Sequence, residues 1–447
     1  MWLVILLLLS VVFIIVATTK LKLHPFLVLL ITAFGYGILC GKMSLGDVVK
    51  SVNSGFGGTI GYIGIVILAG SVIGTFLEKS GGAFKLAESI LKLMGPRNVP
   101  LAMSIIGYIV SIPVFCDSGF VILSSLCRGL SRKAKISLAA SSVALSLGLY
   151  ATHTMVPPTP GPVAAAKLLG ADLGLVIVWG LFVSLFALAA GWLFAVKFAG
   201  RIHINPESEP EESSPDEIVT QGPSAIKSVI PIFLPIVLIV LGSVGKLDSQ
   251  PFGAGNAAAF ISFIGEPVVA LLIGVFFALL LPKKLTTEML STSGWVGQAV
   301  IGGTTIIIIT GCGGAFGTVL ENSGISDVVK GYFGKSAGLS IWLPFIIAAA
   351  LKTAQGSSTV AIITTALIVK SLLGPLGLEA PTARALAVVA IGAGSMVVSH
   401  ANDSYFWVVT GLSKMSVKDG YKLQTLGTLV EGCAAAIVLW VISLVVL

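Results

Sequence analysis

Long apolar runs recur along this 447-residue chain, and polar residues interrupt two of them. A helix that crosses a bilayer needs roughly 20 apolar residues. The runs therefore predict ten spanning helices, at about 2–18, 25–41, 58–77, 136–152, 173–197, 228–244, 257–281, 299–320, 384–399 and 426–447. This pattern indicates an all-α integral membrane protein.

The two interrupted stretches are too short to hold two full spans each. The first contains Phe115-Cys116-Asp117-Ser118-Gly119-Phe120, and the second contains Lys352-Thr353-Ala354-Gln355-Gly356-Ser357-Ser358-Thr359. Each stretch predicts a re-entrant hairpin, over about 99–130 and about 339–373, with the polar residues near its tip. Polar side chains at membrane depth mark a substrate or ion path by default.

Similar landmarks recur in the two halves of the chain at nearly one spacing. The octamers 74–81 and 317–324 are identical at six of eight positions. His153 and His400 are 247 residues apart, and Asp117 and Gln355 are 238 apart. The landmarks predict two membrane repeats, 1–198 and 226–447, each with five spans and one hairpin, joined by an acidic, proline-rich cytoplasmic linker at 199–225.

The basic residues of the loops predict the orientation of the spans, because cytoplasmic loops are enriched in Lys and Arg. Lys20 and Lys22 follow the first span, which places the N-terminus in the periplasm. The basic segment 128–135 and the pair at 283–284 are cytoplasmic in this scheme, and the C-terminus is periplasmic. The first repeat then begins outside and the second inside, an inverted topology typical of secondary transporters.

Composition agrees with a membrane protein. Hydrophobic residues make up 55% of the chain and charged residues 11%, with a mean hydropathy of +1.02, whereas about a quarter of a soluble chain is charged. The net charge of +7 comes from residues scattered over short loops. We therefore expect a lipid bilayer and a small solute as partners, and no nucleic acid.

Catalytic and metal-binding signatures are missing from the sequence. The five cysteines show no paired spacing, so neither a disulfide framework nor a zinc site is indicated. There is no Walker loop for ATP and no His-Glu-x-x-His motif. The sequence predicts no enzymatic activity, no cofactor and no metal.

Asp117 is the carboxylate of the first hairpin, and Ser118 and Gly119 follow it. A low dielectric disfavours the charged form of a carboxyl group, a property that suits a proton carrier. The alternative is an aspartate that caps a helix at the break. We favour the carrier and count all three residues among the substrate-site candidates.

The second hairpin carries Gly356, Ser357, Ser358 and Thr359 at the start of its second arm. Free amide groups and the helix dipole at a helix N-terminus attract carboxylates, so these residues and the adjacent Gln355 predict an anion site. The alternative is a run of small residues that permits close helix packing. Lys352 either neutralises a substrate carboxylate or extends to the outer interface, and both readings stay open.

Two further segments bring polar groups towards the hairpin tips. The first, 152–162, starts with Thr152, His153 and Thr154, and its prolines exclude a continuous helix. Its counterpart in the second repeat holds His400, Asn402 and Asp403. We predict Thr152, His153, Thr154, His400 and Asn402 as substrate ligands. The candidates for proton coupling are Asp117, His153, His400 and Asp403, although a membrane histidine often only links two helices.

Several motifs in the same order resemble those of the bacterial gluconate permease family. They are Gly57-Gly58-Thr59, 115–120, 152–162, 313–316, 356–361 and 399–407, and together they extend over essentially the whole chain. The resemblance implies an inner-membrane, proton-coupled symporter for gluconate or related sugar acids. It also implies membership of the wider ion-transporter superfamily of hairpin-bearing, often dimeric carriers, some of which work as elevators.

The departures from the family pattern fall on the predicted site. Members commonly have Glu-Val where this chain has Asp117-Ser118, often His in place of Thr159, and Arg in place of Lys352. The alternatives kept open are therefore another small organic acid, D-serine, which a similar carrier transports, and coupling to Na⁺ through unwound carbonyl groups. A passive channel and a membrane-embedded enzyme are the least favoured.

Overall fold

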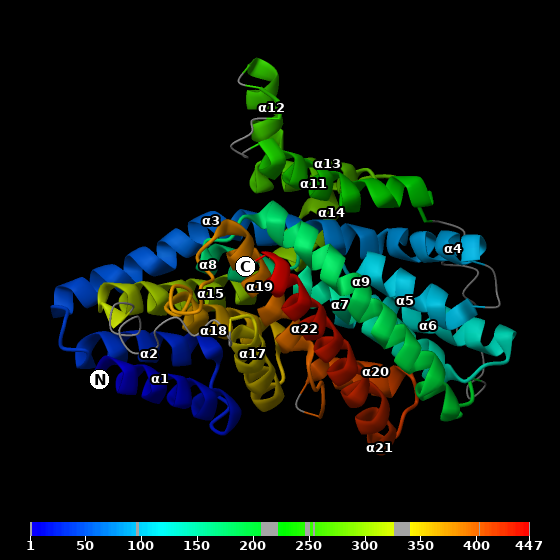
Figure 1. Ribbon diagram of the computed structural model, residues 1–447. Helices are drawn as coiled ribbons and strands as arrows, with labels where there is room; N and C mark the ends of the chain where they lie inside the picture. Colours follow the sequence, from blue (N-terminus) through cyan, green and yellow to red (C-terminus); the bar gives the residue numbers. More distant parts are fainter. Residues whose placement is uncertain are drawn as a thin grey trace.

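The computed structural model describes residues 2–94, 98–206, 222–245, 251–253, 255–325, 340–401 and 403–446, and these are helical throughout with connecting turns. The first half contains α1 (Trp2–Thr19), α2 (Pro25–Leu39), α3 (Leu45–Lys79), α4 (Gly82–Met94), α5 (Val99–Val110), α6 (Cys116–Ala134), α7 (Leu138–Met155), α8 (Pro160–Leu169), α9 (Leu173–Lys197) and the short η2 (Ala199–Arg201). The all-α prediction is confirmed (Figure 1).

The second half contains α11 (Ala225–Gly245), α12 (Asn256–Ile264), α13 (Pro267–Leu279), α14 (Thr287–Leu290), α15 (Trp295–Asn322), α17 (Trp342–Gln355), α18 (Ser358–Lys370), α19 (Pro381–Met396), α20 (Ser404–Leu412), α21 (Val417–Gly420), the π-helical turn η4 (Tyr421–Thr425) and α22 (Leu426–Val446). Most of the predicted linker, 207–221, lies outside the described residues.

Five helical stretches of the described chain are long and apolar enough to cross a membrane, or six if one bent pair counts as a single span. The predicted spans 25–41 and 384–399 correspond to the shorter apolar helices α2 and α19. The predicted span 136–152 corresponds to α7, which is buried in protein along its whole length. The total of ten spans stays a prediction.

Two element boundaries differ from the predictions for local reasons. α3 begins at Leu45 rather than near residue 58, because the Ser44 hydroxyl accepts a hydrogen bond from the Asp47 amide and starts the helix within a polar stretch. The single span predicted at 257–281 is two helices, α12 and α13, which meet at 67°. Pro267 is the first residue of α13, and proline favours that position because its missing N–H group has no intrahelical acceptor there.

A helix pair lies at each predicted hairpin. α5 and α6 are separated by residues 111–115, and α17 and α18 by Gly356 and Ser357. The chain is also broken between α7 and α8, as the prolines of 152–162 predict, and between α19 and α20. Breaks of this kind leave helix ends inside the protein, where their free backbone groups are available to a ligand.

The order of elements repeats between the two halves. α5, α6, α7 and α8 begin at 99, 116, 138 and 160, and α17, α18, α19 and α20 begin at 342, 358, 381 and 404. The spacing between corresponding starts is thus 242 to 244 residues. The opposed orientation of the two halves in a membrane stays a prediction.

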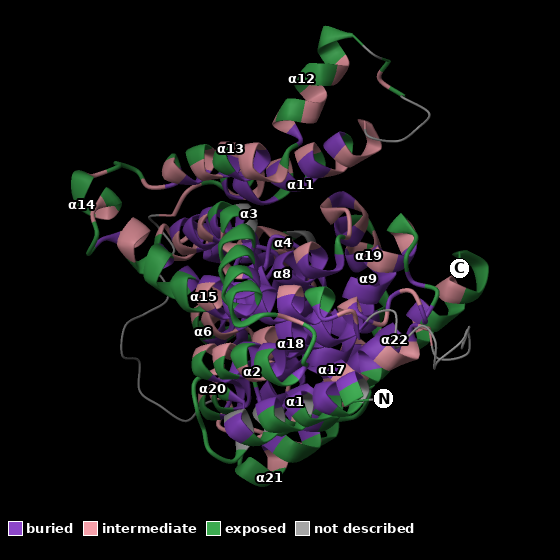
Figure 2. Cartoon of the chain, turned by 90° about the vertical axis from the view of Figure 1, so that its left-hand side faces the viewer, coloured by how far each residue is buried: buried purple, intermediate pink, exposed green. Residues whose placement is uncertain are grey.

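The helices α7, α8, α18 and α19 form the interior of the molecule. Figure 2 shows buried residues concentrated around α8, α17 and α18, whereas α1, α2 and α12 carry many exposed positions. Many of those exposed side chains are apolar, such as Leu8 in α1 and Phe260 in α12. In both views α12 projects away from the remaining helices.

Candidate functional site

The breaks of the two halves meet around one cavity of about 300 Å³. The starts of α6, α18 and α20 and the C-terminal part of α7 contribute its walls. The lining residues are Phe115, Cys116, Asp117, Tyr150, His153, Gly356, Ser357, Ser358, Thr359, Asp403, Ser404 and Tyr405. Both hairpin tips and both unwound segments of the prediction are therefore represented in one site.

Asp117 lies in the first turn of α6 and is partly exposed to the cavity. The Ser404 hydroxyl of the second half donates to its Oδ1 at 3.3 Å, and the Cys116 thiol donates to its Oδ2 at 3.6 Å. The carboxylate thus bridges the first hairpin and the start of α20. It lies beside a positive helix end, which stabilises a negative charge.

The second tip presents a helix N-terminus to the same cavity. Gly356 has a φ of +87°, a conformation that glycine adopts without strain, and ends α17. The Ser357 hydroxyl then caps α18 by accepting from the Val360 amide at 3.3 Å. The amides of Ser358 and Thr359 lie in the first turn of α18, where helix geometry provides no intrahelical acceptor. These groups are placed to bind an anion.

Lys352 lies behind the second tip and does not reach a membrane interface. Its side chain is completely buried, and its Nζ donates to the Gly356 carbonyl at 2.7 Å and to Asp403 Oδ2 at 2.5 Å. The ammonium group is also 6.0 Å from the centroid of the Tyr150 ring. The reading in which Lys352 extends to the outer interface is therefore wrong, because its charge is neutralised within the protein by Asp403.

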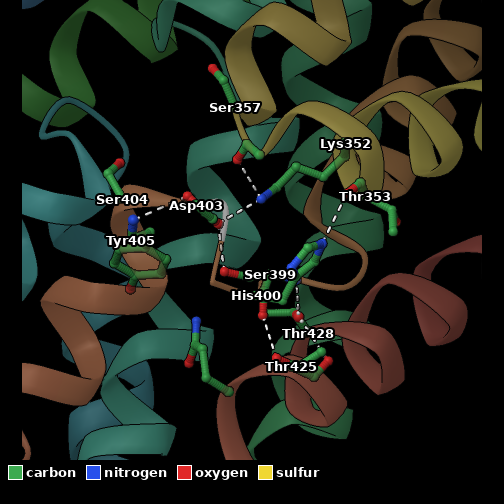
Figure 3. A network of polar contacts seen from close by, with 12 residues as sticks. Lys352, Thr353, Ser357, Ser399, His400, Asp403, Ser404, Tyr405, Thr425 and Thr428 are labelled. Carbon is green, nitrogen blue, oxygen red and sulfur yellow. Dashed lines mark hydrogen bonds and ion pairs between the residues drawn. The ribbon is translucent and has the colours of Figure 1, made fainter. Parts of the chain in front are cut away.

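Asp403 is the centre of the polar network shown in Figure 3. Besides Lys352, its Oδ2 accepts from the Ser399 hydroxyl at 2.5 Å. Its Oδ1 accepts from the Tyr405 amide at 3.0 Å, which caps α20. The carboxylate is 5% exposed and borders the cavity. One ion pair thus fixes the break in the second hairpin against the start of α20.

The two predicted histidines lie in different surroundings. His153 borders the cavity, is 6% exposed and has no hydrogen-bond partner at its Nδ1. His400 lies outside the cavity lining, and its Nε2 is 2.9 Å from the Thr353 carbonyl oxygen. His400 therefore links α17 to the segment before α20 in this conformation, the structural alternative considered above.

The other predicted residues that the structure describes are not in the cavity lining. The hydroxyls of Thr152 and Thr154 donate to the carbonyls of Tyr108 and Tyr150, at 2.8 and 3.2 Å. Ser118 and Gly119 follow Asp117 on α6 outside the lining. The side chain of Gln355 and the whole of Asn402 lie outside the described residues. The substrate contacts predicted for these residues stay predictions.

Sequence reasoning missed Tyr150, Ser404 and Tyr405, which line the cavity. Their positions carried a signal, since Tyr150 precedes His153 by one helical turn and Ser404 and Tyr405 follow Asp403 directly. It also missed Glu431, a completely buried acid in an apolar run. An ionisable residue within such a run is by itself grounds for a functional hypothesis.

A second polar cavity, of about 530 Å³, lies at the other end of α18. Its lining includes Lys167, Lys370 and Arg384 together with Glu321 and Glu379. Lys370 pairs with Glu321 at 2.7 Å. Because α18 has 13 residues, this cavity and the hairpin tip are about 20 Å apart along the helix.

The comparisons with known proteins agree with this architecture. Residues 2–445 match the family described as GntP family permease. The chain is 34% identical to a gluconate permease of Pseudomonas aeruginosa, over 98% of this chain and 97% of that protein. It is 30% identical to the D-serine transporter DsdX of Escherichia coli K12, over 100% of this chain and 99% of that protein.

A solved structure supports the same fold. The YdaH transporter of Alcanivorax borkumensis superposes with a TM-score of 0.66 over 94% of this chain and 98% of that one, at 13% identity. The match along the whole chain, the identity to curated relatives and the helical membrane architecture lead to one conclusion. The chain is an integral membrane transport protein that belongs to the GntP family of permeases.

Proposed function

We propose that the protein imports gluconate or a related sugar acid together with a proton, by alternating access to the cavity between the hairpin tips. The observation that carries this proposal is the cavity itself, where the N-terminus of α18 and its serine and threonine hydroxyls lie beside two carboxyl groups. The helix end suits a substrate carboxylate. The hydroxyls suit the hydroxyl groups of a sugar acid.

The charges around the cavity favour coupling to a monovalent cation, and we propose that this cation is a proton. Asp117, Asp403 and Lys352 together carry a formal charge of −1 when all are ionised. A bound anion would make the net formal charge of the site −2. The site is poorly solvated, so its like charges would repel each other strongly. Binding one proton to either carboxylate restores −1. Anion and proton then bind more favourably together than separately.

The ion pair of Lys352 and Asp403 suggests how the substrate is bound and released: the Lys352 ammonium exchanges the Asp403 carboxylate for the substrate carboxylate. Protonation of Asp403 would remove its charge and leave the Lys352 ammonium free to pair with a substrate carboxylate. Loss of the proton would restore the pair and release the substrate. In this scheme Lys352 contacts the substrate only while Asp403 is protonated. This agrees with the position of Lys352 behind the cavity lining.

A hydroxy-amino acid such as D-serine is the second candidate. The similarity to DsdX over the whole chain favours it, and so does Asp117, whose partly exposed carboxylate could pair with a substrate ammonium group. D-serine would then place its carboxylate at α18 and its amino group at α6.

Location and assembly form the rest of the proposal. We place the protein in the bacterial inner membrane with both termini in the periplasm. A homodimer is proposed from the resemblance to a superfamily whose members are often dimeric. Polar cavities lie at both ends of α18, and we propose that the substrate occupies each of them at a different stage of transport.

Uptake into proteoliposomes tests the function. Labelled gluconate should accumulate above its equilibrium level when the outside is acidic, and unlabelled gluconate inside should accelerate its exchange. A Na⁺ gradient alone should give no accumulation, and excess D-serine should not compete. Equilibration without accelerated exchange would indicate a channel. Accumulation of D-serine but not gluconate would establish the second candidate.

A single hydroxyl at the second tip tests anion recognition. Ser358→Ala should weaken substrate binding at least tenfold, because a hydrogen bond to a charged group contributes about 1.5–3 kcal/mol. Equilibrium binding of labelled substrate to purified protein measures the effect. Thr425→Ala is the control, since its hydroxyl donates to the Ser399 carbonyl away from the cavity. Equal affinities for wild type and Ser358→Ala would favour the helix-packing role.

A further inference from the structure

Glu431 is a completely buried acid in α22 that the proposed mechanism does not use. Its side chain is 0% exposed, and neither carboxyl oxygen has a hydrogen-bond partner in the described structure. Gly191 of α9 faces it closely, since a Cβ atom at that position would lie 3.0 Å from Leu147 Cβ and 3.4 Å from Glu431 Oε1. The carboxyl group therefore lies where α7, α9 and α22 pack together.

The surroundings of Glu431 supply no compensating charge. Within the described residues, the titratable side chains on the helices packed against α22 are Tyr150 and His153 of α7, Lys197 of α9, Lys352 of α17, Arg384 of α19, and Tyr421 and Lys422 of η4. None of them forms an ion pair or hydrogen bond with Glu431. The Tyr405 hydroxyl of α20 also reaches α7, where it donates to the Ser146 carbonyl. An isolated charge in such an interior is strongly disfavoured, so the carboxyl group holds its proton in this conformation.

A chain of polar contacts leads from the cavity towards Glu431. The Tyr405 hydroxyl donates to the Ser146 carbonyl at 2.9 Å, and the Ser146 hydroxyl donates to Gln424 Oε1 at 2.8 Å. The Gln424 Nε2 is buried and has no partner. Gln424 belongs to the π-helical turn η4, which continues directly into α22. Turns of this type occur frequently at functional sites.

Glu431 and Gln424 face the same side of this helix. They are seven residues apart, which is about two helical turns and returns a side chain to nearly the same face. Gln424 contacts Ser146 of α7, and Glu431 lies beside the neighbouring Leu147. The two polar groups therefore occupy one seam between α7 and α22, with the cavity at its end.

We propose that Glu431 is a second proton-binding site of the transporter, which takes up a coupling proton in one conformation and releases it in the other. This inference rests on the proposed proton symport and adds a site inside the helical core to the carboxylates of the cavity. A lone carboxyl group suits a proton rather than Na⁺, which needs several oxygen ligands. The described residues contain no cluster of acidic or metal-binding side chains around it.

Infrared difference spectroscopy tests the protonation of Glu431 without any substrate. The C=O stretch of a protonated carboxylic acid is separate from carboxylate bands and shifts in D₂O. Wild-type protein at neutral pH should show such a band that Glu431→Gln lacks. Identical spectra would overturn the inference, whatever the substrate proves to be. Should Glu431→Gln not fold, Glu431→Asp should shift the band, and an unshifted band would overturn the inference equally.

Transport separates a coupling role from a structural one. Glu431→Gln should lower accumulation driven by a pH gradient at least tenfold, while substrate exchange at equal concentrations stays within about twofold of wild type. Glu288→Gln, which alters an exposed acid on α14, should accumulate substrate normally. Accumulation by Glu431→Gln at the wild-type level, or a parallel loss of accumulation and exchange, would overturn the inference. A wild type that is not driven by protons would instead refute the proposed symport.

Discussion

Lys352→Met is expected to lower the free energy of unfolding by about 3–5 kcal/mol and to abolish uptake. The substitution leaves Asp403 as an uncompensated charge in a site where it is only 5% exposed, and breaking a buried pair from one side has a cost of this size. Methionine fills a similar volume, so the effect reports the charge rather than a void. Thermal or denaturant unfolding of the purified protein in detergent measures it.

The matched test removes both charges. Asp403→Asn keeps a side-chain oxygen that can cap α20, and in the Lys352→Met background it should recover most of the lost stability. Uptake should stay absent in the double variant, because the exchange of Asp403 for a substrate carboxylate needs both charges. A double variant that transports like wild type would refute the proposed exchange, and a stable, active Lys352→Met protein would show that the pair is dispensable.

The general architecture could be predicted because its signals are local. The prolines of 152–162 exclude a continuous helix, and Gly356 ends α17 where the polar run begins. The repeated order of landmarks then indicated that the breaks of the two halves would meet. The structure brings Asp117, Ser357 and Asp403 to one cavity accordingly.

The partners of the charged groups could not be predicted in the same way. Lys352 and Asp403 are 51 residues apart, and their contact depends on how α17 packs beside the segment before α20. The histidine at 400 was expected in the site by symmetry with His153, yet it bonds a carbonyl of α17 instead. Such outcomes depend on side-chain packing between helices, which a single sequence does not specify.

Glu431 was missed for a different reason. Its neighbours are apolar or small, so the run 426–447 has the composition of a lipid-facing span. The structure instead turns the face that carries Glu431 towards α7 and α9. One acid in a spanning run does not show which face of the helix it occupies, and the repeat offered no acidic counterpart to draw attention to it.

Asp117→Asn is expected to abolish uphill uptake while leaving the site folded. Asparagine has nearly the same shape and can still accept a hydrogen bond from Ser404, so the junction of α6 and α20 should persist. It cannot release a proton, and it removes one of the two cavity carboxylates. Accumulation of labelled substrate under a pH gradient should fall to the equilibrium level, a loss of at least tenfold.

Exchange of substrate between equal pools separates coupling from binding in this variant. It should continue at a substantial fraction of the wild-type rate, because Ser358, Thr359 and the end of α18 are unchanged. Asp172→Asn is the control, since Asp172 caps α9 and lies outside the cavity lining. If Asp117→Asn still concentrates substrate under a pH gradient alone, the coupling proton binds elsewhere. His153, His400, Asp403 and Glu431 would then be the remaining candidates, and Glu431→Gln would test the acid that lies outside the cavity and the buried ion pair.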